Sequence, residues 1–324
     1  MGYIDMHCDT LMLAYFMGEN LNDSKKLSVD FARMKQSGAM AQFFAIFMPD
    51  KGAYEHFHVK EMTDQEYFDA LFALFLSNLK DHSDVIKRAY SAQDILANEK
   101  EGRMSAILSV EDGRLVNGEF EKLEEFYDLG VRALALTWNF ENCFGFPNST
   151  DEKIMQKGLK PFGKEAVEYM NELGMLVDVS HLSEGGFRDV AKISSKPFVA
   201  THSNCRALSP HQRNLSDEMI RTLAEKGGVM GLNFCPAFLN EDTSCEDSTI
   251  DAMVAHLKHA RNVGGIEVVA LGSDLDGTGG NMEIANCGEY PKLFDRLAKE
   301  GFSSGDIDKI THENVLRVFK DAVW

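Results

Sequence analysis

Short apolar segments alternate with amphipathic segments along the whole chain of 324 residues. Eight of the apolar segments have the length of a β-strand and lack the polar alternation of a half-exposed strand. They are Tyr3–His7, Ala41–Met48, Met104–Glu111, Val131–Trp138, Met175–His181, Phe198–His202, Gly228–Phe234 and Val268–Asp274. Repeated strand-then-helix order predicts a parallel sheet, and eight such units indicate closure into an α/β fold with a (β/α)8 TIM-like barrel.

The amphipathic segments between these strands predict the helices of the barrel. They are Ser28–Ser37, Asp64–Asp81, Ser91–Glu99, Phe120–Leu129, Gly163–Leu173, Ser183–Ile193, Ser216–Lys226, Ile250–Val263, Tyr290–Glu300, Ser304–Ile310 and His312–Ala322. An open, doubly wound sheet is the structural rival, but no glycine-rich phosphate loop follows the first strand. No linker-like stretch interrupts the pattern, so we expect residues 1–324 to form a single domain.

Three long loops are expected after strands, at Pro49–Glu61, Asn139–Pro161 and Pro236–Thr249. In a (β/α)8 barrel, loops that follow strands lie on the face that carries the active site. We therefore expect all three loops to border the functional site.

The composition excludes several kinds of partner. The net charge of −18 argues against binding to nucleic acid or to an anionic membrane surface, because both require clustered lysine and arginine. The six cysteines form no C-x-x-C pair and are expected to be free thiols. No apolar stretch reaches the ~20 residues of a membrane-spanning helix, and the N-terminus does not resemble a signal peptide. The expected location is cytoplasmic.

Side chains of the kinds that bind metals stand at the ends of five predicted strands. His7 and Asp9 form an H-x-D pair, which period-two geometry directs to one side of the chain. Glu111, His181, His202 and Asp274 end four further strands. Asp276 is a competing choice for Asp274, but it precedes Gly277 as in a turn. The other histidines lie in predicted loops or helices, and among them the His56-x-His58 pair could reach over the site from its loop.

Together these residues could hold two divalent metal ions. His7, Asp9 and Glu111 would bind one ion, and Glu111, His181 and His202 would bind the other, with Glu111 as the bridge. Two ions ~3.5–4 Å apart can deprotonate a bridging water and polarise a carbonyl oxygen. Nitrogen and oxygen ligands without cysteine favour Zn²⁺ over soft metals. We therefore expect two Zn²⁺ ions per chain, with other divalent metals as the alternative.

The motifs, in their order, resemble those of the membrane (renal) dipeptidase family of zinc peptidases in the metal-dependent hydrolase superfamily. They are H-x-D, V-E-D-G, L-T-W-N, D-V-S-H, T-H-S-N, R-N-L-S-D, G-S-D-L-D-G and E-N-V-L-R-V-F, and they cover residue 3 to about residue 320. The resemblance implies a barrel of the metal-dependent hydrolase type with two zinc ions. It also implies that Asp274 is the catalytic acid and base, and that Arg213 binds the C-terminal carboxylate of the substrate. Residue chemistry alone would place Arg213 on the surface at a helix entry.

The chain departs from the family on the fourth predicted strand. Mammalian members carry a histidine after L-T that is thought to steady the oxyanion, and Trp138 stands in that position here. Asn139 or Asn142 could donate a hydrogen bond instead, as could a histidine from a loop. Trp138 could equally form a wall of the substrate pocket.

The leading hypothesis is a dinuclear zinc dipeptidase that hydrolyses L-Xaa-L/D-Xaa dipeptides by attack of a metal-bridging hydroxide. A different amide or ester hydrolase on the same barrel is the first alternative, because loops set the chemistry on this scaffold. A barrel that binds metal without catalysis is the second. The expected partner is a small dipeptide, and the family resemblance also suggests a homodimer.

Overall fold

Eight parallel strands close into a barrel, as the alternating pattern predicts. The computed structural model describes residues 2–323. The strands follow one another around the barrel in the order β2, β1, β10, β8, β7, β6, β5 and β4, and β4 pairs with β2 to complete the circle. Their bounds are β1 Tyr3–Asp5, β2 Ala39–Phe47, β4 Met104–Glu111, β5 Val131–Ala135, β6 Leu176–Asp178, β7 Val199–Ala200, β8 Val229–Leu232 and β10 Val269–Leu271.

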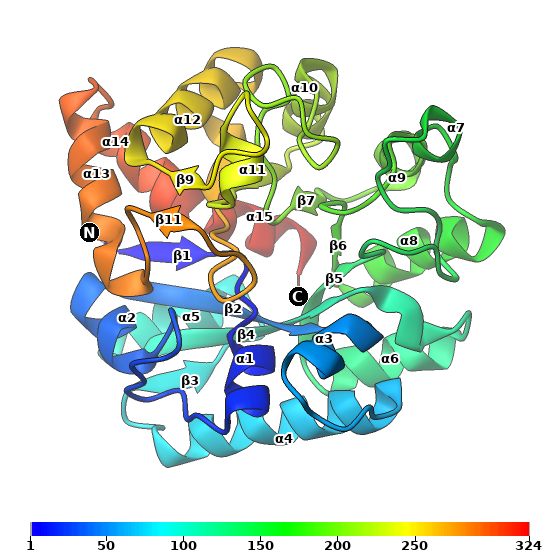
Figure 1. Ribbon diagram of the computed structural model, residues 1–324, viewed down its shortest axis with the longest axis horizontal. Coiled ribbons are helices and arrows are strands. Elements are labelled where there is room, and N and C mark those ends of the chain that lie inside the picture. Colours follow the sequence, from blue (N-terminus) through cyan, green and yellow to red (C-terminus); the bar gives the residue numbers. More distant parts are fainter. Residues whose placement is uncertain (1, 324) are drawn as a thin grey trace.

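Helices surround the barrel, and the longer ones agree closely with the predicted segments (Figure 1). Asp64–Asp81 is a helix with the predicted bounds, and Thr63 and Glu66 form a capping box at its start. The predicted helix at Ser28–Ser37 begins only at Phe31, because Asp30 provides its N-cap. The bounds are α2 Phe31–Ser37, α4 Asp64–Asp81, α5 Ala92–Lys100, α6 Phe120–Asp128, α8 Pro161–Leu173, α9 Glu184–Ile193, α10 Asp217–Glu225, α12 Ile250–Gly264, α13 Tyr290–Lys299, α14 Ser304–Asp308 and α15 Asn314–Ala322.

Several short elements escaped the sequence patterns. Four are helices where no helix was predicted, and the last three of them lie in the expected long loops. They are α1 Thr10–Met17, α3 Lys51–His56, α7 Glu152–Met155 and α11 Pro236–Leu239. The prediction of an unbroken loop at Pro49–Glu61 was therefore wrong, because the carboxylate of Asp50 accepts a hydrogen bond from Ala53 N and starts α3. The missed strands are β3 Ile86–Arg88, which pairs with the first part of β4, and β9 Asp247–Ser248 with β11 Asn281–Met282, which form a separate small sheet.

The interior of the barrel is a packed apolar core, not a pore. One buried apolar cluster takes a side chain from each of the eight barrel strands, including Ile4, Phe43, Ile107, Ala133, Leu176, Val199, Val229 and Ala270. Helix α15 adds Val315, Val318 and Phe319 to the same cluster, and the rings of Phe43 and Phe319 meet edge to face at 5.7 Å. Helix α15 lies near the centre of the molecule in Figure 1. The core and α15 fill the barrel below the carboxyl ends of the strands, which remain open for a site.

Regular strand pairing stops before most of the predicted ligand residues. Strand β1 ends at Asp5 and β6 ends at Asp178, whereas the predicted runs extended to His7 and His181. The carboxylate of Asp5 accepts the main-chain N–H of His7, and that of Asp178 accepts the N–H of Ser180. Each carboxylate accepts a main-chain N–H that would otherwise bond to the neighbouring strand. The chain can therefore leave the barrel wall after β1 and β6 and turn His7 and His181 toward the axis.

Candidate active site

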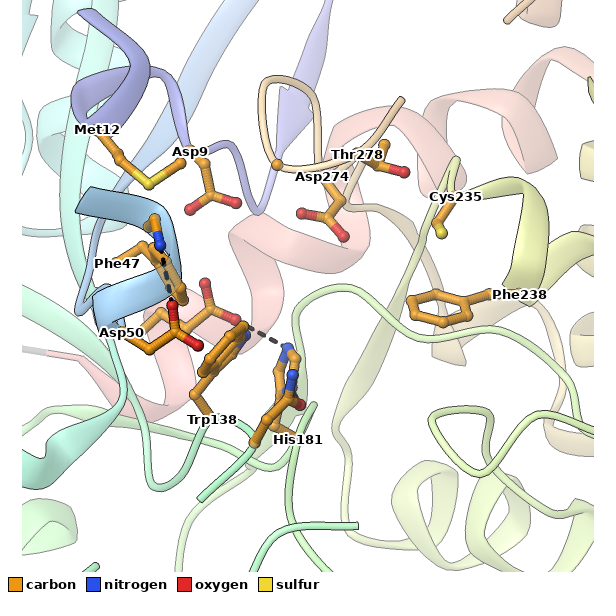
Figure 2. A pocket seen from close by; sticks show the side chains of 14 residues that line it. Asp9, Met12, Phe47, Asp50, Trp138, His181, Cys235, Phe238, Asp274 and Thr278 are labelled. Atoms are coloured by element: carbon orange, nitrogen blue, oxygen red, sulfur yellow. Dashed lines mark hydrogen bonds and ion pairs between the residues drawn. The ribbon is translucent and has the colours of Figure 1, made fainter. Parts of the chain in front are cut away.

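The six side chains singled out at the predicted strand ends meet at one mouth of the barrel. His7 and Asp9 follow β1, Glu111 ends β4, and the other three follow β6, β7 and β10, namely His181, His202 and Asp274. All five predicted metal ligands are at most 7% exposed. Residues 267 positions apart in sequence therefore lie side by side, and Figure 2 shows Asp9, His181 and Asp274 facing one cavity.

Glu111 lies between two groups of imidazoles. Its Oε2 is 3.3 Å from His7 Nε2, which is also 3.7 Å from Asp9 Oδ2 and 3.8 Å from Asp274 Oδ1. Its Oε1 is 2.8 Å from His181 Nε2 and 3.4 Å from His202 Nε2. Each carboxylate oxygen thus faces a different set of nitrogens, which is the arrangement of a bridging ligand.

The hydrogen-bonding partners of His202 fix which ring nitrogen carries its proton. Thr201 donates its hydroxyl proton to Asp178 Oδ2 and lies 2.9 Å from His202 Nδ1. A hydroxyl has a single proton, so Thr201 must accept from Nδ1–H of His202. The lone pair of His202 Nε2 therefore points into the site. Asp178 orients the imidazole indirectly, because it holds the Thr201 hydroxyl that accepts from Nδ1–H.

The same reasoning applies to His181, with a consequence for the whole cluster. Its Nδ1 is 3.2 Å from Asn139 Oδ1, an atom that only accepts, so Nδ1 carries the proton. Its Nε2 lone pair then faces that of His202 Nε2 at 3.0 Å, and both face Glu111. Across residues 2–323, neither His7 Nε2 nor Asp9 Oδ1 has a hydrogen-bond partner. Buried acceptors that face one another without a donor need a cation between them, so these residues fit a metal centre.

The pKa shifts divide the three imidazoles. The pKa values of His181 and His202 are lowered, whereas the burial of His7 is outweighed by Glu111 and Asp9, which raise its pKa well above its usual value. Burial, and then Arg213, lower the pKa of His181 to about 4, and burial and His7 hold that of His202 well below its usual value. Burial alone would raise the pKa of Glu111, but His7 and His181 outweigh it and keep this pKa well below its usual range. Burial and the neighbouring Glu111 raise the pKa of Asp9 to about 7. Neutral His181 and His202 beside an ionised Glu111 are in the protonation states that a divalent metal requires, and His7 would have to release its proton when a metal binds.

Asp274 is held differently from the other acids. Its backbone has φ of 63°, a left-handed conformation that is uncommon outside glycine. Asn233, which sequence reasoning missed although it lies near the end of the predicted seventh strand, donates to Asp274 Oδ2 at 2.8 Å. Burial raises the pKa of Asp274. One oxygen is thus anchored, while the other lies near His7 and the cavity.

Gly277 leaves room for these carboxylates. A Cβ atom at this position would lie 1.9 Å from Asp9 Oδ2 and 2.6 Å from Asp274 Oδ1. Asp276 is occupied elsewhere, because it accepts hydrogen bonds from the Thr10 hydroxyl at 2.6 Å and from Ser28 N at 2.6 Å. Of the two neighbouring aspartates, only Asp274 is directed at the cluster.

Two cavities adjoin the cluster and share three lining residues, namely Asn139, His181 and Phe238. One, of about 320 Å³, is lined by the acids of the cluster together with Met12, Phe47, Asp50 and Trp138. The other, of about 440 Å³, is lined by Asn148, Ser149, His211 and Arg213. The cluster therefore lies beside the junction of two spaces, a suitable place for the bond between two substrate residues. Among the described residues, neither His56 nor His58 lines either cavity. From α3, Ala53 lines the smaller one.

Arg213 is buried, not on the surface. It is 4% exposed and donates to the main-chain oxygens of Ser180 and His202, while its Nε has no partner within residues 2–323. Its guanidinium also lies 5.4 Å from the ring centre of Phe238. A cation that is buried without a carboxylate ion pair can bind an anion that enters from outside.

The fourth-strand residues occupy distinct places. Trp138 lines the smaller cavity, with its ring centre 4.8 Å from that of Phe47. Asn139 lines both cavities while it accepts from His181. The amide of Asn142 is fully engaged by Asp112, Leu136 and Phe144, so it holds the loop and is not free for substrate.

Comparisons with known proteins agree with this geometry. A model of the membrane dipeptidase family, peptidase family M19, matches residues 1–323. An uncharacterized dipeptidase of Schizosaccharomyces pombe is 31% identical over 98% of this chain and 80% of its own length. Dipeptidase tcpJ of Claviceps purpurea is 28% identical over 98% of this chain and 75% of its own. A crystal structure of a metallo peptidase from Rhodobacter sphaeroides, liganded with a phosphinate mimic of the dipeptide L-Ala-D-Ala, has a TM-score of 0.91 and 27% identity, and covers 100% of this chain and 99% of that one.

The barrel and the cluster at its mouth define a metal-dependent hydrolase. The chain belongs to the membrane dipeptidase family, and it is a metallo-dipeptidase, a hydrolase that acts on peptide bonds. The family resemblance and the barrel prediction are thereby confirmed. Despite the family's name, none of the helices within residues 2–323 has both the length and the apolar character needed to span a bilayer.

Proposed function

We propose that this chain is a dinuclear zinc dipeptidase acting on L-Xaa-L/D-Xaa dipeptides, with residues 1–324 as one catalytic domain. The observation that carries the proposal is the convergence of three imidazoles and three carboxylates on one buried centre, where His7 Nε2 and Asp9 Oδ1 have no hydrogen-bond partner among residues 2–323. His7, Asp9 and Glu111 would hold one ion, and Glu111, His181 and His202 the other. When bound, two Zn²⁺ ions would lower the pKa of a water molecule and polarise the scissile carbonyl.

Asp274 is the proposed proton carrier. Its anchored oxygen accepts from Asn233, and its other oxygen borders the cavity beside His7. Its raised pKa suits a group that takes a proton from water and passes it to the leaving amine. The anchoring by Asn233 keeps the carboxylate in one orientation during both transfers.

The two cavities suggest how a dipeptide lies. Arg213 in the larger cavity would bind the C-terminal carboxylate, with Nε as the free donor and the guanidinium positioned by Ser180 and His202. The N-terminal residue would then occupy the smaller cavity against Trp138, while Asn139 borders both. The Rhodobacter sphaeroides relative is liganded with a mimic of L-Ala-D-Ala, which supports including D-residues at the C-terminal position.

A substrate comparison tests the carboxylate contact. Zinc-loaded wild type and Arg213→Ala are assayed with L,L and L,D dipeptides and with the same peptides amidated at the C-terminus. Arg213→Ala should raise KM for free dipeptides by ~10–100-fold, as expected for loss of a charged hydrogen bond of ~1.5–3 kcal/mol. The wild type should discriminate against amidated peptides, and the variant should not. Equal discrimination by both proteins would remove Arg213 from this role, and hydrolysis of no dipeptide would remove the proposed function.

Homodimer formation and a cytoplasmic location remain predictions from the sequence. Neither is needed for the proposed chemistry, because every residue that carries it lies in one chain.

A further inference from the structure

The smaller cavity has an apolar wall that ends in a single carboxylate outside the metal cluster. Phe47, from the end of β2, and Trp138, from the loop after β5, pack edge to face at 4.8 Å, and Met12 of α1 lines the cavity with them. Asp50 follows on the loop after β2. Figure 2 shows Asp50 next to Phe47 and Trp138, on the side of the cavity away from Cys235 and Phe238.

The carboxylate of Asp50 retains an unpaired oxygen. Oδ1 accepts from Ala53 N at 3.1 Å and caps α3, whereas Oδ2 makes no hydrogen bond or ion pair with any residue from 2 to 323. Asp50 is half-buried, so its charge is only partly solvated. A cation that enters the cavity could therefore pair with it.

Nearby cations do not neutralise Asp50. Arg114 holds the same loop by donating to the main-chain oxygens of Met48 and Pro49, but its charge is paired with Asp64 at 2.7 Å and with Asp112 at 3.4 Å. Lys51 is largely exposed and lies 3.7 Å from Glu61. The negative charge at this end of the cavity is available to a ligand.

We propose that Asp50 and Trp138 form a subsite for a cationic side chain, lysine above all, on the N-terminal residue of the dipeptide. This inference rests on the proposed function and adds a substrate class to it. The methylene groups of lysine would pack on Met12 and Phe47, and its ammonium group would meet the Asp50 carboxylate beside the indole of Trp138.

The α-amino group of the substrate is a less suitable partner for Asp50. That group lies two bonds from the scissile carbonyl carbon, so it must stay close to the metal cluster. The carboxylates in that cluster are Asp9, Glu111 and Asp274, and Asp50 forms no ion pair within 4.0 Å with any of its histidines. A lysine side chain, by contrast, extends away from the reacting carbonyl along the cavity wall.

The test compares two substrates that differ by a single charged group. The zinc-loaded enzyme is assayed with L-Lys-L-Ala and with L-norleucyl-L-Ala, whose side chain has the same four-carbon length without the ammonium. We expect kcat/KM to favour the lysine peptide by about tenfold. In Asp50→Asn the ratio of the two kcat/KM values should fall to near one, because asparagine keeps the N-cap and removes the charge.

Matched variants separate this subsite from general effects of charge and stability. Glu61→Gln removes a negative charge from the same loop outside the cavity lining, and it should keep the wild-type ratio. Asp50→Ser also retains a capping side chain and should behave like Asp50→Asn. L-lysine should inhibit the wild type more strongly than L-norleucine, and Asp50→Asn should lose this difference.

Two results would overturn the inference while leaving the dipeptidase proposal intact. One is a wild-type ratio of one or less. The other is an equal loss of kcat/KM for both peptides in Asp50→Asn, which would assign Asp50 to the shared α-amino group or to loop structure. Hydrolysis of neither peptide by metal-loaded wild type would contradict the proposed function itself, and this inference with it.

Discussion

Two kinds of buried carboxylate lie at the same mouth of the barrel. Asp178 is surrounded by donors, since it accepts from the main-chain N–H and the hydroxyl of both Ser180 and Thr201. Asp5 likewise accepts from Ser273 N at 2.9 Å, from the Ser273 hydroxyl at 2.6 Å and from the Tyr290 hydroxyl at 2.7 Å. Glu111 faces imidazole nitrogens, and Oδ1 of Asp9 finds no donor within residues 2–323.

The difference distinguishes carboxylates whose partners are supplied by the fold from carboxylates that could bind a metal ion. A buried carboxylate costs several kcal/mol of desolvation unless donors compensate it. The protein supplies those donors to Asp5 and Asp178, which anchor the chain where β1 and β6 end. Oδ1 of Asp9 has no such donor among residues 2–323, and Oδ2 lies 3.7 Å from His7 Nε2, so a bound cation would supply the missing compensation. Removing a member of the first group should affect stability, and removing a member of the second should affect metal content and turnover.

The largest effect is expected for Glu111→Gln. The amide removes the negative charge that both groups of imidazoles share, so metal content should fall and dipeptide turnover should drop by at least ~10³-fold. Metal analysis and kinetics measure the two quantities. Full metal content with wild-type turnover would contradict the bridging role.

Asp274→Asn should separate chemistry from metal binding. The asparagine fills the same space and can keep one contact with Asn233, but it cannot carry a proton. Turnover should fall by ~10²–10³-fold while both metals stay bound. Loss of the metals from this variant, measured on the same sample, would reassign Asp274 as a ligand.

Asp178→Asn should show the opposite pattern. Its new amide group would meet N–H and O–H donors of Ser180 and Thr201, so the free energy of unfolding should fall by about 2–4 kcal/mol. Urea unfolding of the metal-free protein measures this loss directly. A variant as stable as wild type would break the distinction drawn between the two kinds of carboxylate.

The smallest effect concerns a buried histidine that the protein satisfies by itself. His256 accepts from Cys205 N at Nδ1 and donates from Nε2 to Leu239 O, each at 3.0 Å, and burial lowers its pKa to about 4. The unfolded chain, with a pKa near ~6.5, takes up a proton first as the pH falls. The stabilising contribution is therefore complete above pH ~6.5 and declines by about 1.4 kcal/mol per pH unit toward pH ~4.

A comparison with His256→Gln isolates this group from others that titrate. Unfolding free energies of both metal-free proteins, measured by urea titration between pH 7 and pH 4.5, should fall more steeply for wild type. Parallel curves would show that His256 is not held neutral by its two main-chain partners.

The barrel and the convergence of the candidate ligands could be predicted because both depend on patterns that are local in the sequence. Buried parallel strands are continuous apolar runs, and the candidate ligands interrupt them at their ends. The burial of Arg213, by contrast, is not indicated by any local pattern in the sequence. Its burial depends on the main-chain oxygens of Ser180 and His202, which only the fold brings near, so residue chemistry wrongly favoured the surface.

The residues that line the cavities could not be predicted either, because their roles also depend on contacts between distant parts of the chain. Asp50 reaches the cavity because it caps a short helix within an expected loop, and Asn139 accepts from His181 across 42 positions. The sequence offers Asn142 as an equally good hydrogen-bond donor to the substrate. In the structure its amide is instead hydrogen-bonded to Asp112, Leu136 and Phe144. Choosing between such neighbours requires the hydrogen-bond partners, which lie far apart along the chain.

Zinc stoichiometry measured together with dipeptide hydrolysis tests the central claim most directly. Protein equilibrated with zinc and freed of excess metal should hold two ions per chain, lose both ions and its activity on chelation, and regain both when zinc returns. Protein that holds no metal yet hydrolyses dipeptides at an undiminished rate would contradict the account.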